Sequence, residues 1–415
     1  TLYELFDEEA DTVATELQKA GYTTAIVGKW HIKTEPQGFD FYKVFKAQGT
    51  YRDPSFRVTG LDEDEPDFRE RKQEPMQGYT TDIITDLAIE WLDGRDKTKP
   101  FFLMVTHKAP HGPFYYPERH EHALDGVDIP EPDSLWEDLS HRSEGSRNEG
   151  LFIEKFVERA EAKNYPTGQL DTTGMTAEEK RKAGYQKYLK DYLRTVLAVD
   201  DSVGALTDYI DEHGLADNTI IIYTSDQGMF LGEHNYIDKR WIFEESLRMP
   251  FVIRYPKGIE AGKVVDEICL NIDFAPTFLD YAGVDIPDSM QGRSFRPVLE
   301  GNTPEDWRKS MYYRYWMQDN RPAHFGIRTD KYKLIFFYGK GLDIVPWKNR
   351  QDTRVGWEFY DLSKDPQELH NEYNNPEYAE IIADLKVELA LLREKYDDTD
   401  ENRPEMQRLL EANWN

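Results

Sequence analysis

Three segments of this sequence place lysine, histidine, acid or amide side chains directly after short runs of apolar and β-branched residues. Such runs are typical of buried strands. In open α/β sheets, ligands bind beyond the carboxyl ends of the strands, so these side chains are expected to share one pocket. The reactive side chains at the three predicted strand ends are Lys29, His31, His107, Lys108, His111, Asp226 and Gln227.

A fourth polar segment follows Asp226 on a predicted loop. It contains Glu233, His234, Lys239 and Arg240. Together the four segments offer a carboxylate, an amide oxygen, lysines and histidines. This combination suits an anionic ester held by basic groups and a hard cation.

Each of these residues also has an ordinary explanation. Lys29 alone would be a solvated loop residue, because lysine is mostly exposed. His107 and His111 are four apart, but Pro110 between them argues against a helical pair of zinc ligands. Asp226 could be a turn aspartate. The site is therefore predicted from the joint occurrence of these residues at strand ends, and not from any one of them.

Composition excludes several functional classes. The 415 residues include 79 acidic and 51 basic side chains, a formal net charge of −28, which disfavours binding to nucleic acid or to anionic membranes. No apolar run is long enough to cross a bilayer, so membrane insertion is not expected. Cys269 is the only cysteine, which rules out a disulfide framework and a cysteine-based zinc site. Its apolar neighbours predict a small buried side chain.

The alternation of strands and helices predicts an α/β fold over residues 1–300 and a smaller α+β domain over residues 301–415. The first region should contain a mostly parallel sheet flanked by helices, and the second an antiparallel sheet and a helix. Predicted helices cover 5–17, 187–213, closed by Gly214, and 377–394. Predicted strands cover 23–27, 101–105, 219–223, 251–254, 311–316, 324–328 and 333–338.

Several motifs resemble the type I sulfatase family. The motifs that carry the resemblance are Gly21-Tyr22-Thr23-Thr24-Ala25 with Gly28-Lys29-Trp30-His31, then Pro110-His111-Gly112-Pro113, and then Ser225-Asp226-Gln227-Gly228 with Gly232-Glu233-His234 and Lys239. Similar matches continue through Asp273-Phe274-Ala275-Pro276-Thr277 to Tyr360-Asp361-Leu362-Ser363, so the resemblance covers nearly the whole chain. Bacterial enzymes that desulfate glycans are the nearest relatives that it indicates.

The resemblance implies an alkaline-phosphatase-like fold and a mechanism. A formylglycine attacks sulfur, Ca²⁺ and basic residues hold the sulfate oxygens, and a histidine protonates the leaving alcohol. By carry-over, Asp226 and Gln227 are metal ligands, although the family often has Asn or His at the second position. Lys29 and Lys239 would bind sulfate, His111 would be the general acid and His31 would orient the nucleophile. Further substrate contacts are predicted for His107, His234, Arg240 and His324. Arg328 could instead form an ion pair between the two domains.

One departure from the family concerns the nucleophile. Formylglycine arises from Cys or Ser in Cys/Ser-x-Pro-x-Arg, and residues 1–415 contain no such motif. The family's N-terminal metal-binding aspartates are also absent. A missing upstream segment is the favoured explanation, over a degenerate homologue, and the 415 residues alone are expected to be inactive on aryl sulfates.

Two other functions remain open from the sequence. One is a phosphatase or phosphonate hydrolase of the same superfamily, which would hold two zinc ions with more Asp and His ligands. The other is a catalytically inactive protein that binds glycans. The expected partner in the favoured case is a sulfated carbohydrate, and the expected location is the periplasm or the exterior. The sequence does not reveal the sugar, the sulfate position, exo or endo action, or the oligomeric state.

Overall fold

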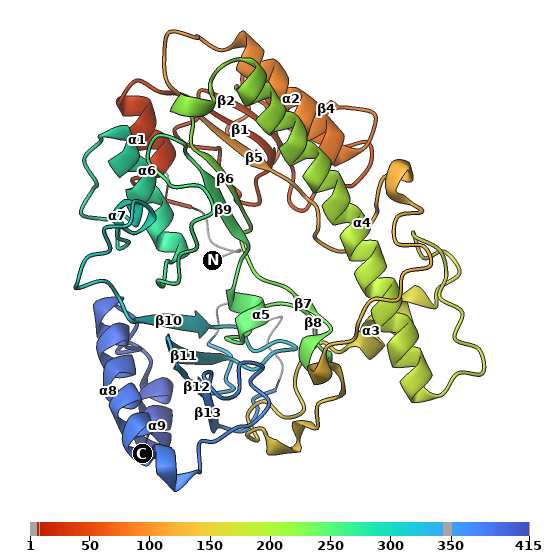
Figure 1. Ribbon diagram of the computed structural model, residues 1–415, viewed down its shortest axis with the longest axis vertical. Coiled ribbons are helices and arrows are strands. Elements are labelled where there is room, and N and C mark those ends of the chain that lie inside the picture. Colours follow the sequence, from red (N-terminus) through yellow and green to blue (C-terminus); the bar gives the residue numbers. More distant parts are fainter. Residues whose placement is uncertain (1–5, 8, 343–350, 415) are drawn as a thin grey trace.

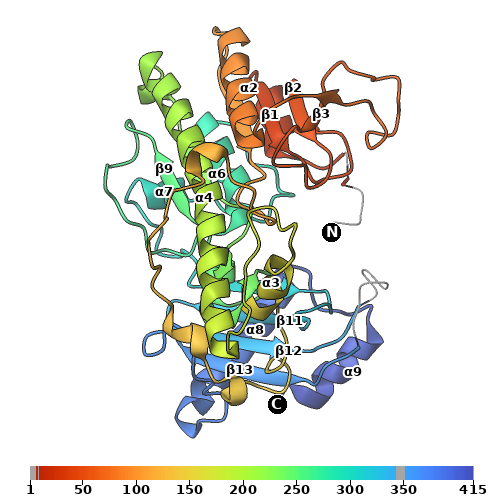
Figure 2. The same cartoon turned by 90° about the vertical axis from the view of Figure 1, so that its right-hand side faces the viewer.

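The computed structural model describes residues 6–7, 9–342 and 351–414 and has an upper and a lower half in the view of Figure 1. The upper half contains a five-stranded sheet and the lower half a four-stranded sheet, and the long helix α4 (Ala177–Glu212) runs along both (Figures 1 and 2). None of the helices in the described residues is long and apolar enough to span a membrane.

The upper sheet has the strand order β4-β3-β2-β1-β5. Its strands are β1 (Thr23–Lys29), β2 (Phe41–Phe45), β3 (Ser55–Val58), β4 (Glu74–Pro75) and β5 (Phe101–Thr106). β1 runs parallel to both β2 and β5, whereas β3 and β4 pair antiparallel, so the sheet is mixed where a mostly parallel one was expected. The α/β architecture itself is confirmed.

A second piece of sheet lies beside β5. It consists of β6 (Ile221–Thr224) and β9 (Phe251–Arg254), which pair antiparallel. Phe101 and Leu103 of β5 pack in the same apolar cluster as Ile221 of β6, beneath α4. Among the strands of the described residues, β5 pairs only with β1 and β6 only with β9, so each has one open edge.

Helices cover both faces of the upper half. They are α1 (Val13–Lys19), α2 (Thr80–Gly94), α6 (Phe274–Ala282) and α7 (Arg296–Leu299), together with the carboxyl-terminal half of α4. Ile84 of α2 packs on Val27 of β1, while Phe278 of α6 packs on Phe102 from the opposite face. The first helix begins later than predicted, because Thr12 caps it through a reciprocal pair of hydrogen bonds with Thr15.

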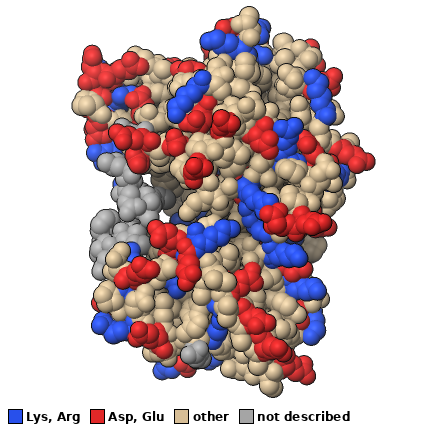
Figure 3. Space-filling model, turned by 90° about the vertical axis from the view of Figure 1, so that its left-hand side faces the viewer, with Lys and Arg blue, Asp and Glu red and all other residues tan. Residues whose placement is uncertain are grey.

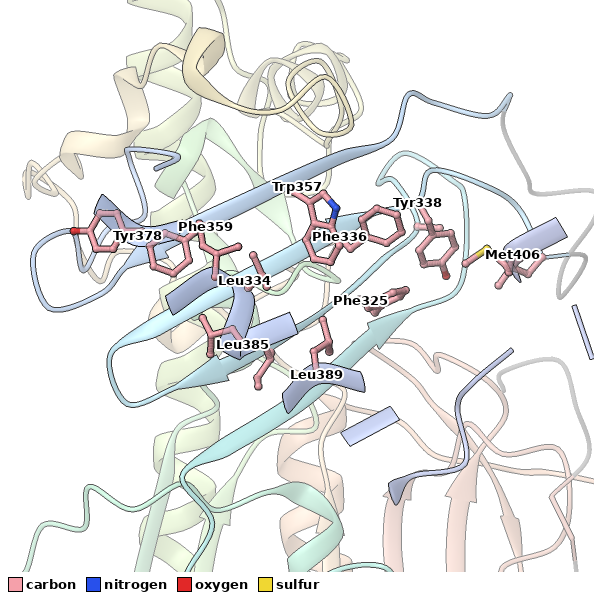
Figure 4. Packing of buried hydrophobic residues seen from close by; sticks show 14 residues of the cluster. Phe325, Leu334, Phe336, Tyr338, Trp357, Phe359, Tyr378, Leu385, Leu389 and Met406 are labelled. Atoms are coloured by element: carbon pink, nitrogen blue, oxygen red, sulfur yellow. The ribbon is translucent and has the colours of Figure 1, made fainter. Parts of the chain in front are cut away.

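The lower half is organised around the antiparallel sheet predicted from the sequence. Its strands are β10 (Ser310–Tyr315), β11 (His324–Thr329), β12 (Tyr332–Phe337) and β13 (Gly356–Asp361), and its helices are α8 (Ala379–Lys395) and α9 (Pro404–Asn413). Alternate residues of each strand face opposite sides. Phe325, Phe336 and Trp357 meet Leu389 and the other helix side chains on one face, as Figure 4 shows.

The opposite face of this sheet is covered by an earlier part of the chain. This part contains β7 (Phe230–Leu231), β8 (Ile237–Asp238) and α5 (Glu244–Leu247), and α3 (Ile153–Ala160) packs nearby on α4. Trp241 and Phe243 are buried against Ile335 and Phe337. Residues before 300 thus belong to the core of the lower half, and the domain boundary at 300 stays a prediction. Cys269 is exposed, contrary to its predicted burial.

Candidate active site

Lys29 is the last residue of β1. The position before it, Gly28, has room only for glycine. Gly28 has φ +115°, and a Cβ atom at this position would lie 2.0 Å from the carbonyl oxygen of Thr106. The hydroxyl of Thr106 donates to the carbonyl oxygen of Lys29 at 2.9 Å. Strands β1 and β5 therefore end side by side, and their carboxyl ends present Lys29 and the loop that follows Thr106 at the same edge of the sheet.

The predicted residues from different strands are close enough for their charges to act on each other. Burial has the largest effect on the pKa of Lys29 and lowers it. The charge of Asp226 opposes this shift, and the charge of Lys239 adds to it. Burial also lowers the pKa of His31, and Lys29 adds to this effect while Asp226 opposes it. The predicted convergence of the ends of β1 and β6 agrees with these interactions.

His111 belongs to the same cluster. Burial lowers its pKa, the hydrogen bond to Gly112 opposes this, and Lys239 and Lys29 lower it further. Because a carbonyl oxygen only accepts, the Nδ1–H of His111 donates to Gly112 O, at 2.8 Å. The neutral ring therefore keeps a lone pair on Nε2.

Lys108 is a member of this cluster that carried no predicted role. It is 6% exposed, and its Nζ donates to the main-chain oxygen of Gln48 at 3.0 Å. Burial, and then the charge of Lys29, lower its pKa to about 8. The signal for it was its place in the strand-end segment between His107 and Ala109.

The site is positively charged within an acidic protein. Among the described residues, the ammonium groups of Lys29, Lys108 and Lys239 form no ion pair, and Asp226 is the carboxylate that acts on this cluster. Elsewhere acidic and basic side chains intermingle on the surface, as on the face in Figure 3. Three lysines without ion-pair partners and one carboxylate leave the cluster with a net positive charge, which is suited to hold an anion.

The loop that carries Lys239 is held in a strained conformation. Asp238 and Arg240 on either side have φ +72° and +85°, which is uncommon for residues other than glycine. Arg321 fixes the loop from the lower half, because its Nε donates to Lys239 O at 3.0 Å and its Nη2 pairs with Asp238. From the other side, Ser246 Oγ accepts from the backbone N–H of Arg240 at 2.8 Å. Such strain persists where the surroundings fix it, often at functional sites.

Asp226 and Gln227 offer oxygen atoms suitable for a hard cation. The Nε2 of Gln227 donates to the carbonyl oxygen of Ser246, which leaves the amide oxygen available as a ligand. Asp226 is exposed and has no hydrogen bond or ion pair within the described residues. Ca²⁺ takes six to eight oxygen ligands, so these two residues fit it as part of a larger set. The described ranges contain no group of three or more His, Cys, Asp or Glu that could hold a metal ion.

Two histidines predicted to contact the substrate are buried, which contradicts that role. His234 is 0% exposed, and its Nδ1 lies 2.5 Å from Glu137 Oε2. His324 is also 0% exposed, and its Nδ1–H donates to Pro322 O at 2.8 Å. His234 packs against Phe243 just before α5, and His324 of β11 packs against Trp241 of the same loop.

The other predicted contacts have different outcomes. His107 Nε2 lies 3.1 Å from Ser202 Oγ on α4, and burial lowers the pKa of His107 to about 4, so this ring faces the helix and not the lysines. Arg240 keeps a side chain that is 40% exposed beside Asp319, and a substrate contact there stays a prediction. Arg328 pairs with Glu244 at 3.1 Å, the alternative weighed for it.

The fold and this positively charged cluster are those of an α/β protein with a site that suits an anion. The chain belongs to the sulfatase family, because the family model described as Sulfatase matches residues 2–284. A second model, described as N-sulphoglucosamine sulphohydrolase, C-terminal, matches residues 232–395.

Individual relatives point in the same direction. The N-acetylglucosamine-6-O-sulfatase of Bacteroides thetaiotaomicron is 40% identical over 443 residues, covering 96% of this chain and 75% of the relative. The arylsulfatase of Clostridium perfringens is 28% identical over 407 residues, covering 91% and 76%.

Solved structures give the same fold. A structure in complex with its substrate D-glucosamine-2-N,6-O-disulfate has a TM-score of 0.84 and 38% identity, and covers 97% of this chain and 85% of that one. A phosphonate monoester hydrolase from Silicibacter pomeroyi has a TM-score of 0.67 at 20% identity, covering 96% and 82%, and this likeness shows the fold alone.

Proposed function

We propose that this sulfatase-family chain acts on a sulfated glucosamine and hydrolyses the ester at the 6-O position. The observation that carries the proposal is the 40% identity to an N-acetylglucosamine-6-O-sulfatase across 96% of the chain. The aligned region includes both the lysine cluster and the lower sheet. The similar structure that holds D-glucosamine-2-N,6-O-disulfate supports the same class of substrate.

Lys29, Lys108 and Lys239 would bind the sulfate group. Their ammonium groups lack carboxylate partners among the described residues, so binding would not first require breaking an ion pair. A sulfate placed among them would reduce their mutual repulsion, and the lowered pKa values of Lys29 and Lys108 would rise on binding. These preorganised donors would stabilise the charge on the sulfate oxygens in the transition state.

His111 would donate the proton that the departing alcohol needs. Its Nδ1–H is fixed on Gly112, so the exchangeable proton is the one on Nε2. In the free site, burial and the nearby lysines lower the pKa of His111. A bound anion would offset the lysines and raise the pKa of His111, so substrate binding would favour the protonated acid.

Asp226 and Gln227 would contribute two oxygen ligands to Ca²⁺. When bound, the cation would neutralise charge on the sulfate oxygens and orient the ester. We further propose a formylglycine nucleophile, as is general in the family, from a residue outside these 415. Oxygen ligands favour calcium over zinc, which separates this proposal from a phosphatase or phosphonate hydrolase.

Calorimetric binding to the 415-residue chain in calcium buffer tests the substrate. Glucosamine-6-sulfate should bind, unsulfated glucosamine should not, and Lys239→Met should lower the affinity at least tenfold. Equal binding of sulfated and unsulfated sugar would refute the proposal. Release of free sulfate, measured on the product of the complete reading frame, should stop on chelation and return with Ca²⁺. A requirement for zinc, or a preference for glucosamine-6-phosphate, would place the protein with the phosphatases.

A further inference from the structure

Gln48 reaches the lysine cluster from a strand that contributed no predicted site residue. It lies in the turn after β2, where Ala47 has φ +51° and Gly49 has φ +60°. A Cβ atom on Gly49 would lie 2.4 Å from the ring of Phe45, so the turn closes tightly on the strand end. Because Phe45 is paired with Lys29 in the parallel register of β1 and β2, the turn places Gln48 beside the end of β1.

Gln48 contacts two members of the cluster at once. Its side-chain Nε2 lies 3.4 Å from Nδ1 of His31, and its main-chain oxygen accepts from Lys108 Nζ at 3.0 Å. Its amide oxygen Oε1 is buried and has no hydrogen-bond partner among the described residues. One residue thus links the histidine after β1 to the lysine after β5.

The orientation of the amide determines which ring nitrogen of His31 carries the proton. With Nε2 of Gln48 facing the ring, Nδ1 of His31 accepts, and the neutral ring is protonated on Nε2. The reverse orientation would bury an NH₂ group with two unpaired donors where Oε1 now lies without a partner. The first orientation leaves the oxygen and at most one N–H of the amide unpaired, and buried carbonyl oxygens lack a partner more often than buried N–H groups do, so the first orientation is favoured.

We propose that Gln48 is a positioning residue that holds His31 in the Nε2–H tautomer. The consequence for catalysis rests on the function proposed above. His31 is then a fixed neutral donor at Nε2, whereas neutral His111, bonded through Nδ1–H to Gly112, has a lone pair there. The two histidines therefore have complementary roles, one a permanent hydrogen-bond donor and the other able to gain and give a proton.

The tautomer can be measured directly in the 415-residue chain by NMR with ¹⁵N-labelled histidine at pH 8. Long-range ¹H–¹⁵N correlations should show His31 protonated on Nε2 and His111 on Nδ1, and loss of signals in His31→Gln and His111→Gln assigns them. Nδ1–H on His31 in the unmodified protein would overturn the proposal without any other variant.

Gln48→Glu tests the cause. A carboxylate only accepts, so the proton of His31 should move to Nδ1 or the ring should become doubly protonated, while His111 stays unchanged. Gln73→Glu adds the same charge on an exposed side chain and should leave His31 as it is. If Gln48→Glu does not fold, Gln48→Ala should give a mixture of both tautomers. An unchanged Nε2–H tautomer in either folded variant would refute the role of Gln48.

This assay needs neither substrate nor metal. A failure of the tautomer prediction would leave sugar binding untouched, and a failure of sugar binding would leave the tautomer result intact.

Discussion

Replacing Lys108 with methionine should stabilise the protein at neutral pH, because the lysine charge is held where it is unfavourable. Lys108 is 6% exposed, and burial and Lys29 lower its pKa from 10.5 to about 8. A pKa difference of this size corresponds to about 3 kcal/mol of destabilisation of the charged form, at about 1.4 kcal/mol per unit. Methionine has a similar unbranched shape and no charge.

The variant also loses two favourable contacts of Lys108. The hydrogen bond to Gln48 is worth about 1 kcal/mol. The contact of Nζ with the Tyr51 ring, 5.1 Å from its centroid, is worth about 0.5–1 kcal/mol. The net expectation is a gain in unfolding free energy of about 1 kcal/mol at pH 7.

The dependence on pH has a definite sign. The pKa of Lys108 is lower in the folded than in the unfolded protein, so between about 8 and 10.5 the unfolded state binds more protons. The stability of the unmodified protein therefore rises with pH across this range. The gain in unfolding free energy from Lys108→Met should be complete below pH 8 and shrink above it. Near pH 10 the variant should become the less stable protein, because only the loss of the two contacts then remains.

Urea unfolding at pH 7, 9 and 10 measures these differences. Lys97→Met removes a charge from an exposed lysine and should show the same small effect at each pH. A Lys108→Met protein that is less stable at pH 7, or a difference that does not change with pH, would refute the reasoning. Calorimetry should also show weaker binding of inorganic sulfate by this variant, since stability is gained by removing an anion ligand.

Three further changes have clear expected outcomes. Gly28→Ala places a Cβ 2.0 Å from Thr106 O, so the midpoint of thermal unfolding should fall sharply, and an unchanged midpoint would contradict the close approach of β1 and β5. Phe336→Ala removes a side chain that is 0% exposed and should cost about 3–5 kcal/mol in urea unfolding, whereas a loss under about 1 kcal/mol would rule out its central packing role. Asp226→Ala should weaken Ca²⁺ binding at least tenfold in calorimetry with the fold intact, and undiminished affinity would exclude it as a ligand.

The elements that the sequence predicted well are those whose patterns are local. The alternating residues of β11 and β12 and the apolar run of β9 defined their strands to within one residue or two. α4 begins at Ala177, ten residues before the predicted helix, because Thr176 and Glu179 form a capping box that the apolar spacing alone did not indicate. Several elements were missed, among them β2, β3, α2 and α6 of the upper half and β13 and α9 of the lower half.

Within the site, strand ends were predictable and side-chain environments were not. Lys29, His31, His111, Asp226 and Lys239 follow recognisable motifs, and their effects on one another's pKa values agree with the predicted shared site. Burial of His234 and His324 depends on contacts with Glu137 and Trp241 that are far away in sequence. The positions of Gln48 and Arg321 depend in the same way on the tertiary fold, and nothing local marks either residue.

The open edges of β5 and β6 have a consequence for handling the isolated chain. A strand with free N–H and C=O groups along one side can pair with another molecule. The side chains here increase this tendency, because β5 is Phe-Phe-Leu-Met-Val-Thr and Val252 on the neighbouring β9 is 63% exposed. The net charge of −28 opposes such association over long distances, but added salt screens it. Concentrated, high-salt solutions of these 415 residues should therefore form intermolecular sheet, and low ionic strength should keep them dispersed.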